Sequence, residues 1–341
     1  MSLKNFGWNP HFENKFEPFR KPETEPARVA LADRERFLLW TESGEREASV
    51  GGRLRHDSDD WPAIGDWVVL ESGSRIAAIL PRCTTFSRKH PGEVTRQQVI
   101  AANIDVLFVV SGLDGDFNLR RIERYLLLAW ESGAKPVVVL NKSDLCADPD
   151  EAVASVERLT SGAPVAVISA LEGSGVSSLD AHLEAGHTTA LVGSSGAGKS
   201  TLVNRMLGEE RQGTQQARAD DSRGRHTTVR RELILTPKGW LLIDTPGLRE
   251  LQLWATSAGI DRAFSDIASL VRDCRFGNCR HNGEPGCAVA AAGIDEARLA
   301  SYTKLQRELA HLDRKQDQRA ALEEKRKIKR IHRAMRDMYR D

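Results

Sequence analysis

The chain has 341 residues, of which 40% are hydrophobic and 28% charged, and its formal net charge is +1. This length allows two or three domains, and the composition is that of an ordinary globular protein. No apolar run reaches the roughly 18–20 residues that a membrane helix needs, and the N-terminal MSLKNFGWNPHFENKF lacks the apolar core of a secretion signal. Five cysteines in such a chain do not form a disulfide framework, so we expect a cytoplasmic protein that does not act at a membrane.

The N-terminal quarter predicts an arm and a small barrel. Residues 1–26 are polar with scattered aromatic side chains, and we interpret them as a loosely held arm. Residues 27–90 contain five short β-type runs separated by turns: ARVALA, RFLLWTES, EASVGG, DWVVLES and SRIAAILP. Five such strands predict a β-barrel, and the OB-fold is the commonest small barrel that binds nucleic acid.

The middle of the chain, residues 91–252, predicts an α/β domain. Near-continuous apolar runs such as IDVLFVVSGL, KPVVVLNKSD, TTALVGSSG and GWLLIDTPG alternate with helical stretches such as LRRIERYLLLAWESG and KSTLVNRMLG. This pattern is typical of a parallel sheet covered on both faces. Ligands of such sheets bind at the carboxyl ends of the strands, where the polar turns fall in this sequence.

The last segment, residues 253–341, combines a Cys/His cluster with a long charged helical pattern that begins near Asp295 and runs to the end. Its final part is strongly basic. A basic helix commonly binds phosphates, although a solvated helix explains the same pattern. The basic side chains that we single out are Arg53, Arg55 and His56 in a probable barrel loop, and Lys325, Arg326, Lys327, Lys329, Arg330, Arg333 and Arg336 in the tail.

A phosphate-binding loop of the GxxxxGK[ST] type lies between an apolar run and a helical one, which is the context that such a loop requires. Its glycines let backbone N–H groups surround a phosphate chain, and the helix N-terminus adds its positive end. We expect Lys199 to reach the β- and γ-phosphates and the Ser200 hydroxyl to bind Mg²⁺. The loop comprises Gly193, Ser194, Ser195, Gly196, Ala197, Gly198, Lys199 and Ser200, and Thr201 follows it.

The base specificity is predicted by the sequence Asn141, Lys142, Ser143 and Asp144, which ends the run VVVL. The carboxylate of Asp144 can accept hydrogen bonds from N1–H and the 2-amino group of guanine, a pattern that adenine does not offer. Ser169 and Ala170 end the run VAVI and fit the backbone contact to guanine O6. These segments together predict a GTP site.

The remaining motifs of the site follow the phosphate-binding loop. We expect Asp244 to hold Mg²⁺ through water and the Gly247 N–H to face the γ-phosphate. Thr227 or Thr228 is expected to complete the Mg²⁺ shell, and spacing does not decide between them; a solvated basic loop is the alternative for this stretch. Leu248 stands where many GTPases place a glutamine that orients water, so we expect slow intrinsic hydrolysis, with His226 as the candidate catalytic group.

The order of the motifs is circularly permuted. NKSD and SAL precede the phosphate-binding loop, which is followed by the switch threonines and DTPG, whereas ordinary GTPases begin with the phosphate-binding loop. The same pocket can form when a chain is cut and rejoined where its ends lie close. The permutation connects the switch after Gly247 directly to the Cys/His segment, so we hypothesise that nucleotide state repositions that segment.

Three thiolates and one imidazole predict a metal site within the last segment. A closed Cys₃His set is typical of a structural zinc ion, and the intervening turns suit a knuckle that wraps the metal. Cys83 and Cys146 lie outside the cluster, and we expect them to be ordinary packing or loop residues. The predicted ligands are Cys274, Cys279, His281 and Cys287.

The combination of barrel, permuted motifs, a hydrophobic residue after DTPG, Cys/His knuckle and basic tail resembles the bacterial RsgA (YjeQ) family of circularly permuted GTPases. The resemblance covers about residues 27–310. It implies a GTP hydrolase (EC 3.6.1.-) that acts in late maturation of the 30S ribosomal subunit, is stimulated by that subunit, and places its OB-fold on 16S rRNA near the decoding region. It also implies that Asn141, Lys142, Asp144 and residues 193–201 bind GTP and that the Cys/His set binds zinc.

Two other interpretations remain open at this point. The first is a nucleotide-gated RNA-binding module in which hydrolysis is incidental, and Leu248 is compatible with it. The second is a P-loop kinase, against which NKSD and the lack of a substrate lid argue. We expect a monomer with one structural zinc ion and with Mg²⁺ accompanying GTP.

Overall fold

The structure is a computed structural model that describes residues 2–33, 35–52, 54, 60–72, 74–89, 97–160, 162–208, 232–244, 257–296, 298–310 and 314. The chain divides into two units, Met1–Leu253 and Trp254–Asp341. Each unit is described by itself. The domain boundaries expected within the first unit remain predictions.

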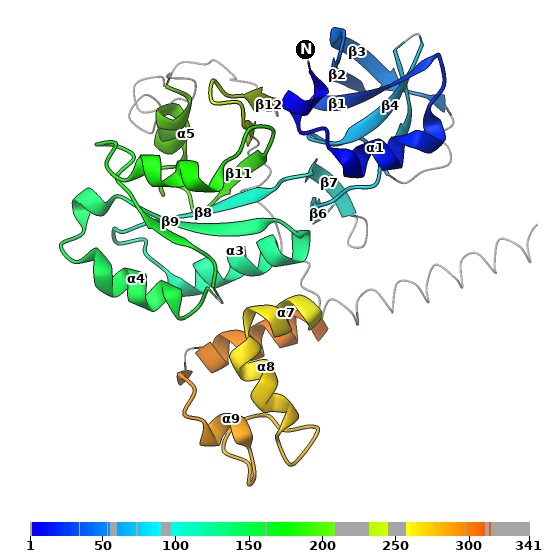
Figure 1. The fold of residues 1–341 in the computed structure, drawn as a ribbon. Helices are drawn as coiled ribbons and strands as arrows, with labels where there is room; N and C mark the ends of the chain where they lie inside the picture. Colours follow the sequence, from blue (N-terminus) through cyan, green and yellow to red (C-terminus); the bar gives the residue numbers. More distant parts are fainter. Residues whose placement is uncertain are drawn as a thin grey trace, which may run out of the picture. The chain divides into compact units, whose positions relative to one another are not determined.

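The predicted five-stranded barrel is confirmed. Its strands follow the order β1-β2-β3-β5-β4, and β4 pairs again with β1, which closes the barrel (Figure 1). The β3–β5 pair is parallel and the other pairs are antiparallel, as in an OB-fold. The side chains that alternate inward form a core with Val29, Phe37, Leu39, Val68 and Ile76. The strands are β1 (Thr24–Asp33), β2 (Arg36–Thr41), β3 (Gly44–Val50), β4 (Trp67–Glu71) and β5 (Arg75–Ile79).

The expectation of a loosely held N-terminal arm is wrong. After a short turn of 3-10 helix, η1 (Leu3–Phe6), the helix α1 (Pro10–Phe16) packs against the barrel, and η2 (Glu17–Phe19) leads into β1. The side chains of Phe6, Phe12 and Phe16 are buried in one cluster with Trp67 of β4. Burial of large aromatic side chains holds the segment in place.

The second part of this unit is built on a sheet whose strands follow the order β10-β9-β8-β11-β13-β12. The first five strands are parallel, and β12 is antiparallel to β13. All residues of β8 and β11 are buried, which explains their unbroken apolar runs. The strands are β8 (Val106–Gly112), β9 (Lys135–Asn141), β10 (Val165–Val167), β11 (Thr188–Val192), β12 (Glu232–Leu235) and β13 (Leu241–Asp244).

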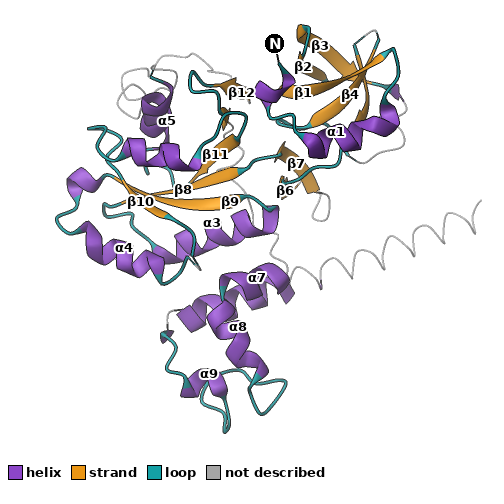
Figure 2. Ribbon diagram, viewed as in Figure 1, coloured by secondary structure: helices purple, strands orange, loops and turns teal. Residues whose placement is uncertain are grey.

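Helices cover both faces of this sheet, as predicted (Figure 2). One face packs against α3 and α4 through residues such as Ile122, Leu126 and Val156. The other face packs against α5 and η4 through Leu202, Val203 and Leu179. The elements are α3 (Leu119–Ser132), η3 (Ser143–Leu145), α4 (Pro149–Glu157), η4 (Val176–His182) and α5 (Lys199–Leu207).

The barrel is joined to the α/β sheet by strand pairing. Leu31 of β1 pairs with Glu232 of β12, so the two parts share one continuous sheet. A two-stranded sheet of β6 (Thr85–Lys89) and β7 (Gln97–Ala102) connects them along the chain. Its residue Ala101 bridges to Ile64 of the barrel.

The C-terminal unit is helical around a turn-rich segment. Phe264 and Tyr302 are in ring contact at 5.5 Å, and Arg298 binds the carboxylate of Asp266 through two hydrogen bonds of 2.7 Å. Part of the predicted long helix is confirmed at residues 298–310, and the basic tail lies outside the described residues. No helix in the described part of the chain is long and apolar enough to cross a membrane. The remaining helices are α7 (Ser257–Ala263), α8 (Ser265–Arg272) and α9 (Ala288–Ala291).

Candidate nucleotide and metal-binding sites

The phosphate-binding loop lies between β11 and α5, as the sequence predicted. Gly193 adopts a φ of +152°, and a Cβ atom there would lie 2.2 Å from the backbone oxygen of Val110, so only glycine fits. The Nζ atom of Lys199 donates a hydrogen bond of 2.8 Å to the Gly193 oxygen and another to the Ser194 oxygen. The ammonium group is therefore held inside the curve of the loop. Ser195 and Gly196 lie in this loop, and Ser200 and Thr201 lie in the first turn of α5.

The predicted base-binding segment follows β9. Lys142 adopts a left-handed conformation with a φ of +65°, which turns the chain into η3. The Ser143 N–H donates to the Ile168 oxygen at 3.1 Å, and the Ser169 hydroxyl donates to Oδ1 of Asp144 at 2.5 Å. The structure thus brings the predicted carboxylate and the Ser169–Ala170 segment together.

Asn141 joins the base-binding segments to the phosphate-binding loop. Its side-chain Nδ2 donates to the Ala197 oxygen and its Oδ1 accepts from the Ala170 N–H, each at 2.9 Å. Asn141 is only 2% exposed, so both hydrogen bonds are shielded from water. A Cβ atom on Gly198 would lie 2.2 Å from Nδ2 of Asn141, which explains a second obligatory glycine in the loop. One amide therefore fixes three segments that the sequence predicted as parts of a single site.

Asp114 and Asp116 contact Lys142 and Ser194 of these segments and are not among the residues predicted from the sequence. The Lys142 ammonium donates to Asp114, and this hydrogen bond holds the pKa of the Asp114 carboxyl below its usual range. Asp116 accepts from Arg121 and from the Ser194 hydroxyl, each at 2.5 Å, and these bonds lower the pKa of its carboxyl. The available signal was the turn LDGD at the end of the apolar run IDVLFVVSGL.

Asp244 ends β13 beside the phosphate-binding loop. Strand β13 is parallel to β11, with Ala190 opposite Ile243, so Asp244 follows at the carboxyl edge of the sheet. The other predicted residues after this strand and in the preceding switch, namely Gly247, Leu248, His226, Thr227 and Thr228, lie outside the described residues.

The four predicted metal ligands come together in the C-terminal unit. One ligand atom of each of Cys274, Cys279, His281 and Cys287 lies within 4.8 Å of those of the other three. Nδ1 of His281 is 3.6 Å from the sulfur of Cys274 and 3.6 Å from that of Cys287. A tetrahedral zinc ion with ordinary Zn–S and Zn–N bond lengths requires a separation of about 3.6 Å between these atoms. The residues therefore fit a tetrahedral metal ion.

Glu284 stabilises the loop that carries these ligands, a role that the sequence analysis did not predict. Its carboxylate accepts from the Arg280 N–H at 2.9 Å and from the Asn282 N–H at 2.8 Å. These two amides flank His281, which adopts a left-handed φ of +62°. The carboxylate thus holds the chain in the bend that presents the imidazole.

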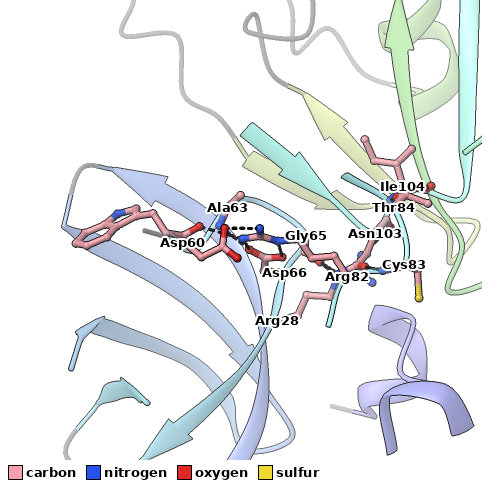
Figure 3. Close-up of polar contacts among 11 residues, drawn as sticks. Arg28, Asp60, Ala63, Gly65, Asp66, Arg82, Cys83, Thr84, Asn103 and Ile104 are labelled. Atoms are coloured by element: carbon pink, nitrogen blue, oxygen red, sulfur yellow. Dashed lines mark hydrogen bonds and ion pairs between the residues drawn. The ribbon is translucent and has the colours of Figure 1, made fainter. Parts of the chain in front are cut away.

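A buried arginine connects the barrel to the strand that carries the phosphate-binding loop. Figure 3 shows this residue, Arg28, near Gly65 and Asn103. Arg28 of β1 is 1% exposed, and burial lowers the pKa of its guanidinium to about 10. Its Nη2 donates to the hydroxyl of Thr188, the first residue of β11, at 2.8 Å. The same guanidinium donates to the backbone oxygens of Phe6, Gly65 and Asn103.

Comparisons with known proteins agree with this architecture. The family model described as RsgA GTPase matches residues 79–254, and one described as 50S ribosome-binding GTPase matches residues 188–327. Two relatives carry the name small ribosomal subunit biogenesis GTPase RsgA. The one from Opitutus terrae is 47% identical and covers 98% of this chain and 97% of its own length. The one from Syntrophotalea carbinolica is 45% identical, with 98% and 96% covered.

Solved structures show the same fold. The crystal structure of YjeQ from Thermotoga maritima matches with a TM-score of 0.64 and 26% identity, over 84% of this chain and 99% of that one. The structure of YloQ, a circularly permuted GTPase, matches with a TM-score of 0.60 and 21% identity, over 85% and 96% of the two chains. Sequence similarity over nearly the whole chain, together with the permuted fold, means that the chain belongs to the RsgA GTPase family.

Proposed function

We propose that this protein hydrolyses GTP to GDP and phosphate and acts on the small ribosomal subunit during its maturation. The small ribosomal subunit is part of the name of two relatives that are similar to this chain over nearly their full length. The observation that carries the GTPase part is the position of Asn141, which contacts both the phosphate-binding loop and the base-binding segments. The activity belongs to the hydrolases of class EC 3.6.1.-, and we place it in the cytoplasm, in a protein that acts as a monomer.

In this proposal each segment has a distinct task in nucleotide binding. Lys199 and the loop Gly193–Gly198 bind the phosphates, and the carboxylate of Asp144 reads guanine. The Ser200 hydroxyl and the Asp244 carboxylate supply the oxygen ligands that Mg²⁺ prefers. Bound Mg²⁺ would neutralise the charge that develops on the phosphates. Thr227 or Thr228 would complete the ligand shell of Mg²⁺, and the Gly247 N–H would face the γ-phosphate.

The hydrolytic step is proposed to depend on the ribosomal subunit. Leu248 follows DTPG and cannot orient water, so the isolated protein is expected to turn over slowly. His226 is the candidate group that orients the attacking water. If His226→Ala hydrolyses GTP at the wild-type rate in the presence of the subunit, this role is wrong. The same leucine favours a second candidate function, a nucleotide-gated RNA-binding module in which hydrolysis is incidental.

The barrel and the C-terminal unit are proposed to contact 16S rRNA. The Cys₃His set would hold one structural zinc ion through Cys274, Cys279, His281 and Cys287, because thiolates and imidazole are the preferred ligands of zinc. The basic residues of the tail would contribute phosphate contacts, so affinity is expected to fall steeply with salt.

Cosedimentation with purified subunits tests the partner. The proposal predicts that the protein sediments with 30S subunits in the presence of a non-hydrolysable GTP analogue and is released when GDP replaces it. Raising the salt concentration should weaken the association. Purified 50S subunits are the matched control. Association with 50S instead of 30S subunits, or equal association in both nucleotide states, would contradict the proposal.

A further inference from the structure

Arg205 on α5 makes contacts that no phosphate-binding or base-binding motif explains. Its Nε donates to the backbone oxygen of Ala170 at 3.2 Å, and its Nη2 donates to the backbone oxygen of Leu171. A Cβ atom on Gly173 would lie 3.4 Å from Cζ of this guanidinium, so the side chain also lies close to Gly173 of the same turn. The guanidinium therefore holds the turn Ser169–Ser174 from outside.

The turn itself is closed by two backbone hydrogen bonds. The Gly173 N–H donates to the Ser169 oxygen at 2.7 Å, and the Ser169 N–H donates to the Ser174 oxygen at 3.0 Å. Gly173 adopts a φ of +87°, which favours glycine at this position. A closed turn moves as one piece, so fixing two of its carbonyl groups fixes the orientation of the rest.

Because the peptide group is planar, the direction of each of these carbonyl groups also fixes the direction of the N–H in the same peptide. A trans peptide is planar, and its C=O and N–H point in opposite directions. Because the Ala170 oxygen is directed at Arg205, the Leu171 N–H points away from α5. Among the described residues no acceptor is recorded for this N–H, whereas the Ala170 N–H is already bonded to Asn141.

The second carbonyl contact reaches the base-reading carboxylate. The Leu171 oxygen belongs to the same peptide as the Glu172 N–H, which donates to the Ser169 hydroxyl oxygen at 3.2 Å. That hydroxyl donates in turn to Oδ1 of Asp144 at 2.5 Å. Arg205 is therefore connected by hydrogen bonds of the turn to Asp144, the residue proposed to bind N1–H and the 2-amino group of guanine.

We propose that Arg205 is a positioning residue for guanine recognition, which directs the Leu171 N–H toward O6 of the bound base and holds Asp144 through Ser169. This rests on the proposed GTP site. Helix α5 begins with Lys199, so a single helix carries the group for the phosphates and the group that sets the base-binding turn. Leu171 is 71% exposed, so this part of the turn is accessible to a ligand.

Comparing two nucleotides tests the proposal with the full-length protein. GDP is one probe, and the other is purine riboside 5′-diphosphate, which keeps ribose and both phosphates but lacks O6, N1–H and the 2-amino group. Arg205→Ala is expected to weaken GDP binding about tenfold and binding of the purine nucleotide less than twofold. A general loss of structure would weaken both nucleotides equally, so equal losses, or no loss for GDP, would overturn the proposal.

Two further variants sharpen the test. Arg205→Lys keeps one donor within reach of the turn and is expected to bind GDP within about threefold of wild type. Arg158→Ala removes an exposed arginine of the same unit and should leave both affinities unchanged. Within the described residues, the side chain of Arg158 forms a hydrogen bond only with Ser155 of α4. These measurements need no ribosomes, so failure of subunit binding leaves them valid, and an absent Arg205 effect leaves the proposed function intact. A wild-type chain that binds no GDP would overturn both.

Discussion

The side-chain amide of Asn141 donates a hydrogen bond of 2.9 Å to the backbone oxygen of Ala197, although the two residues lie 56 positions apart. In this chain Asn141 precedes the phosphate-binding loop instead of following it. The contact shows how a permuted order of motifs still assembles one site. The carboxyl ends of neighbouring parallel strands meet at one edge, whatever order the chain visits them in.

Removing this amide should weaken nucleotide binding. Asn141→Ala deletes two buried hydrogen bonds and leaves the Ala197 oxygen and the Ala170 N–H without their partner. Each such loss costs about 1–3 kcal/mol, so GDP affinity should fall roughly tenfold to a hundredfold. Titration calorimetry with GDP measures it, and Asn14→Ala on the exposed face of α1 is the matched control. Wild-type affinity in Asn141→Ala would contradict this account of the site.

The Lys142–Asp114 pair predicts a specific titration behaviour. The hydrogen bond from Lys142 holds the pKa of Asp114 below its ordinary value of 3.8. Because the folded pKa is depressed, the stabilisation from this pair is fully present above pH 3.8 and is lost as the pH falls through the lower folded value. Lys142→Met should return the Asp114 pKa toward 3.8, as measured by carbon NMR of its carboxyl group.

Lys238→Met is the control for this titration, because Lys238 pairs with Asp180 and has no recorded contact with Asp114. That variant should leave the pKa of Asp114 where it is in the wild type. An Asp114 carboxyl that titrates identically in wild type and in Lys142→Met would show that the lysine does not set its pKa.

Metal removal should unfold the knuckle. The segment from Cys274 to Cys287 is turn-rich, and its described contacts are mostly short-range, so ligand bonds are expected to supply several kcal/mol of its stability. Chelation, or Cys279→Ser, should reduce bound zinc from one ion per chain to near zero and expose the amides of this segment to hydrogen exchange. Cys83→Ser removes an exposed cysteine outside the cluster and should keep the ion. Undiminished amide protection after chelation would count against a structural metal.

The barrel contains a buried ion pair whose loss should be costly (Figure 3). Asp66 is fully buried and accepts hydrogen bonds from Nε of Arg82 at 2.7 Å and from Nη2 at 2.8 Å. Arg82→Ala leaves a buried carboxylate without its partner, and we expect unfolding by denaturant to show a loss of about 3–5 kcal/mol. Arg46→Ala, at an exposed position of β3, should change stability by less than about 0.5 kcal/mol. Equal stabilities of the two variants would contradict this account.

The elements that the sequence predicted well are those with a strong local pattern. A few consecutive residues are enough to recognise the apolar runs of β8 and β11 and the glycine-rich loop after β11. The N-terminal segment also carries a local helix signal. Asn9 caps α1 and Pro10 begins it, which is a typical helix start, and Phe12 and Phe16 share one face of the helix at a spacing of four residues.

Other features could not be predicted because they depend on contacts between distant segments. The guanidinium of Arg28 donates hydrogen bonds to Phe6, Gly65, Asn103 and Thr188, which are distant in the sequence. The residues next to Arg28 in the sequence show only an ordinary strand pattern. The same holds for Asp116, whose partner Ser194 lies 78 positions away. The Cys/His cluster was predictable because cysteine and histidine at short spacing are distinctive, whereas Glu284 supports it through backbone amides and leaves no such pattern.

The most direct test of the central claim is the rate of GTP turnover by the purified protein, measured alone and with purified 30S subunits. Slow turnover alone and an increase of at least about tenfold with the subunit are predicted, because Leu248 leaves the isolated protein without a glutamine that orients water. The same rate with and without 30S subunits would contradict a GTPase that acts on the small subunit, and would favour the RNA-binding module in which hydrolysis is incidental.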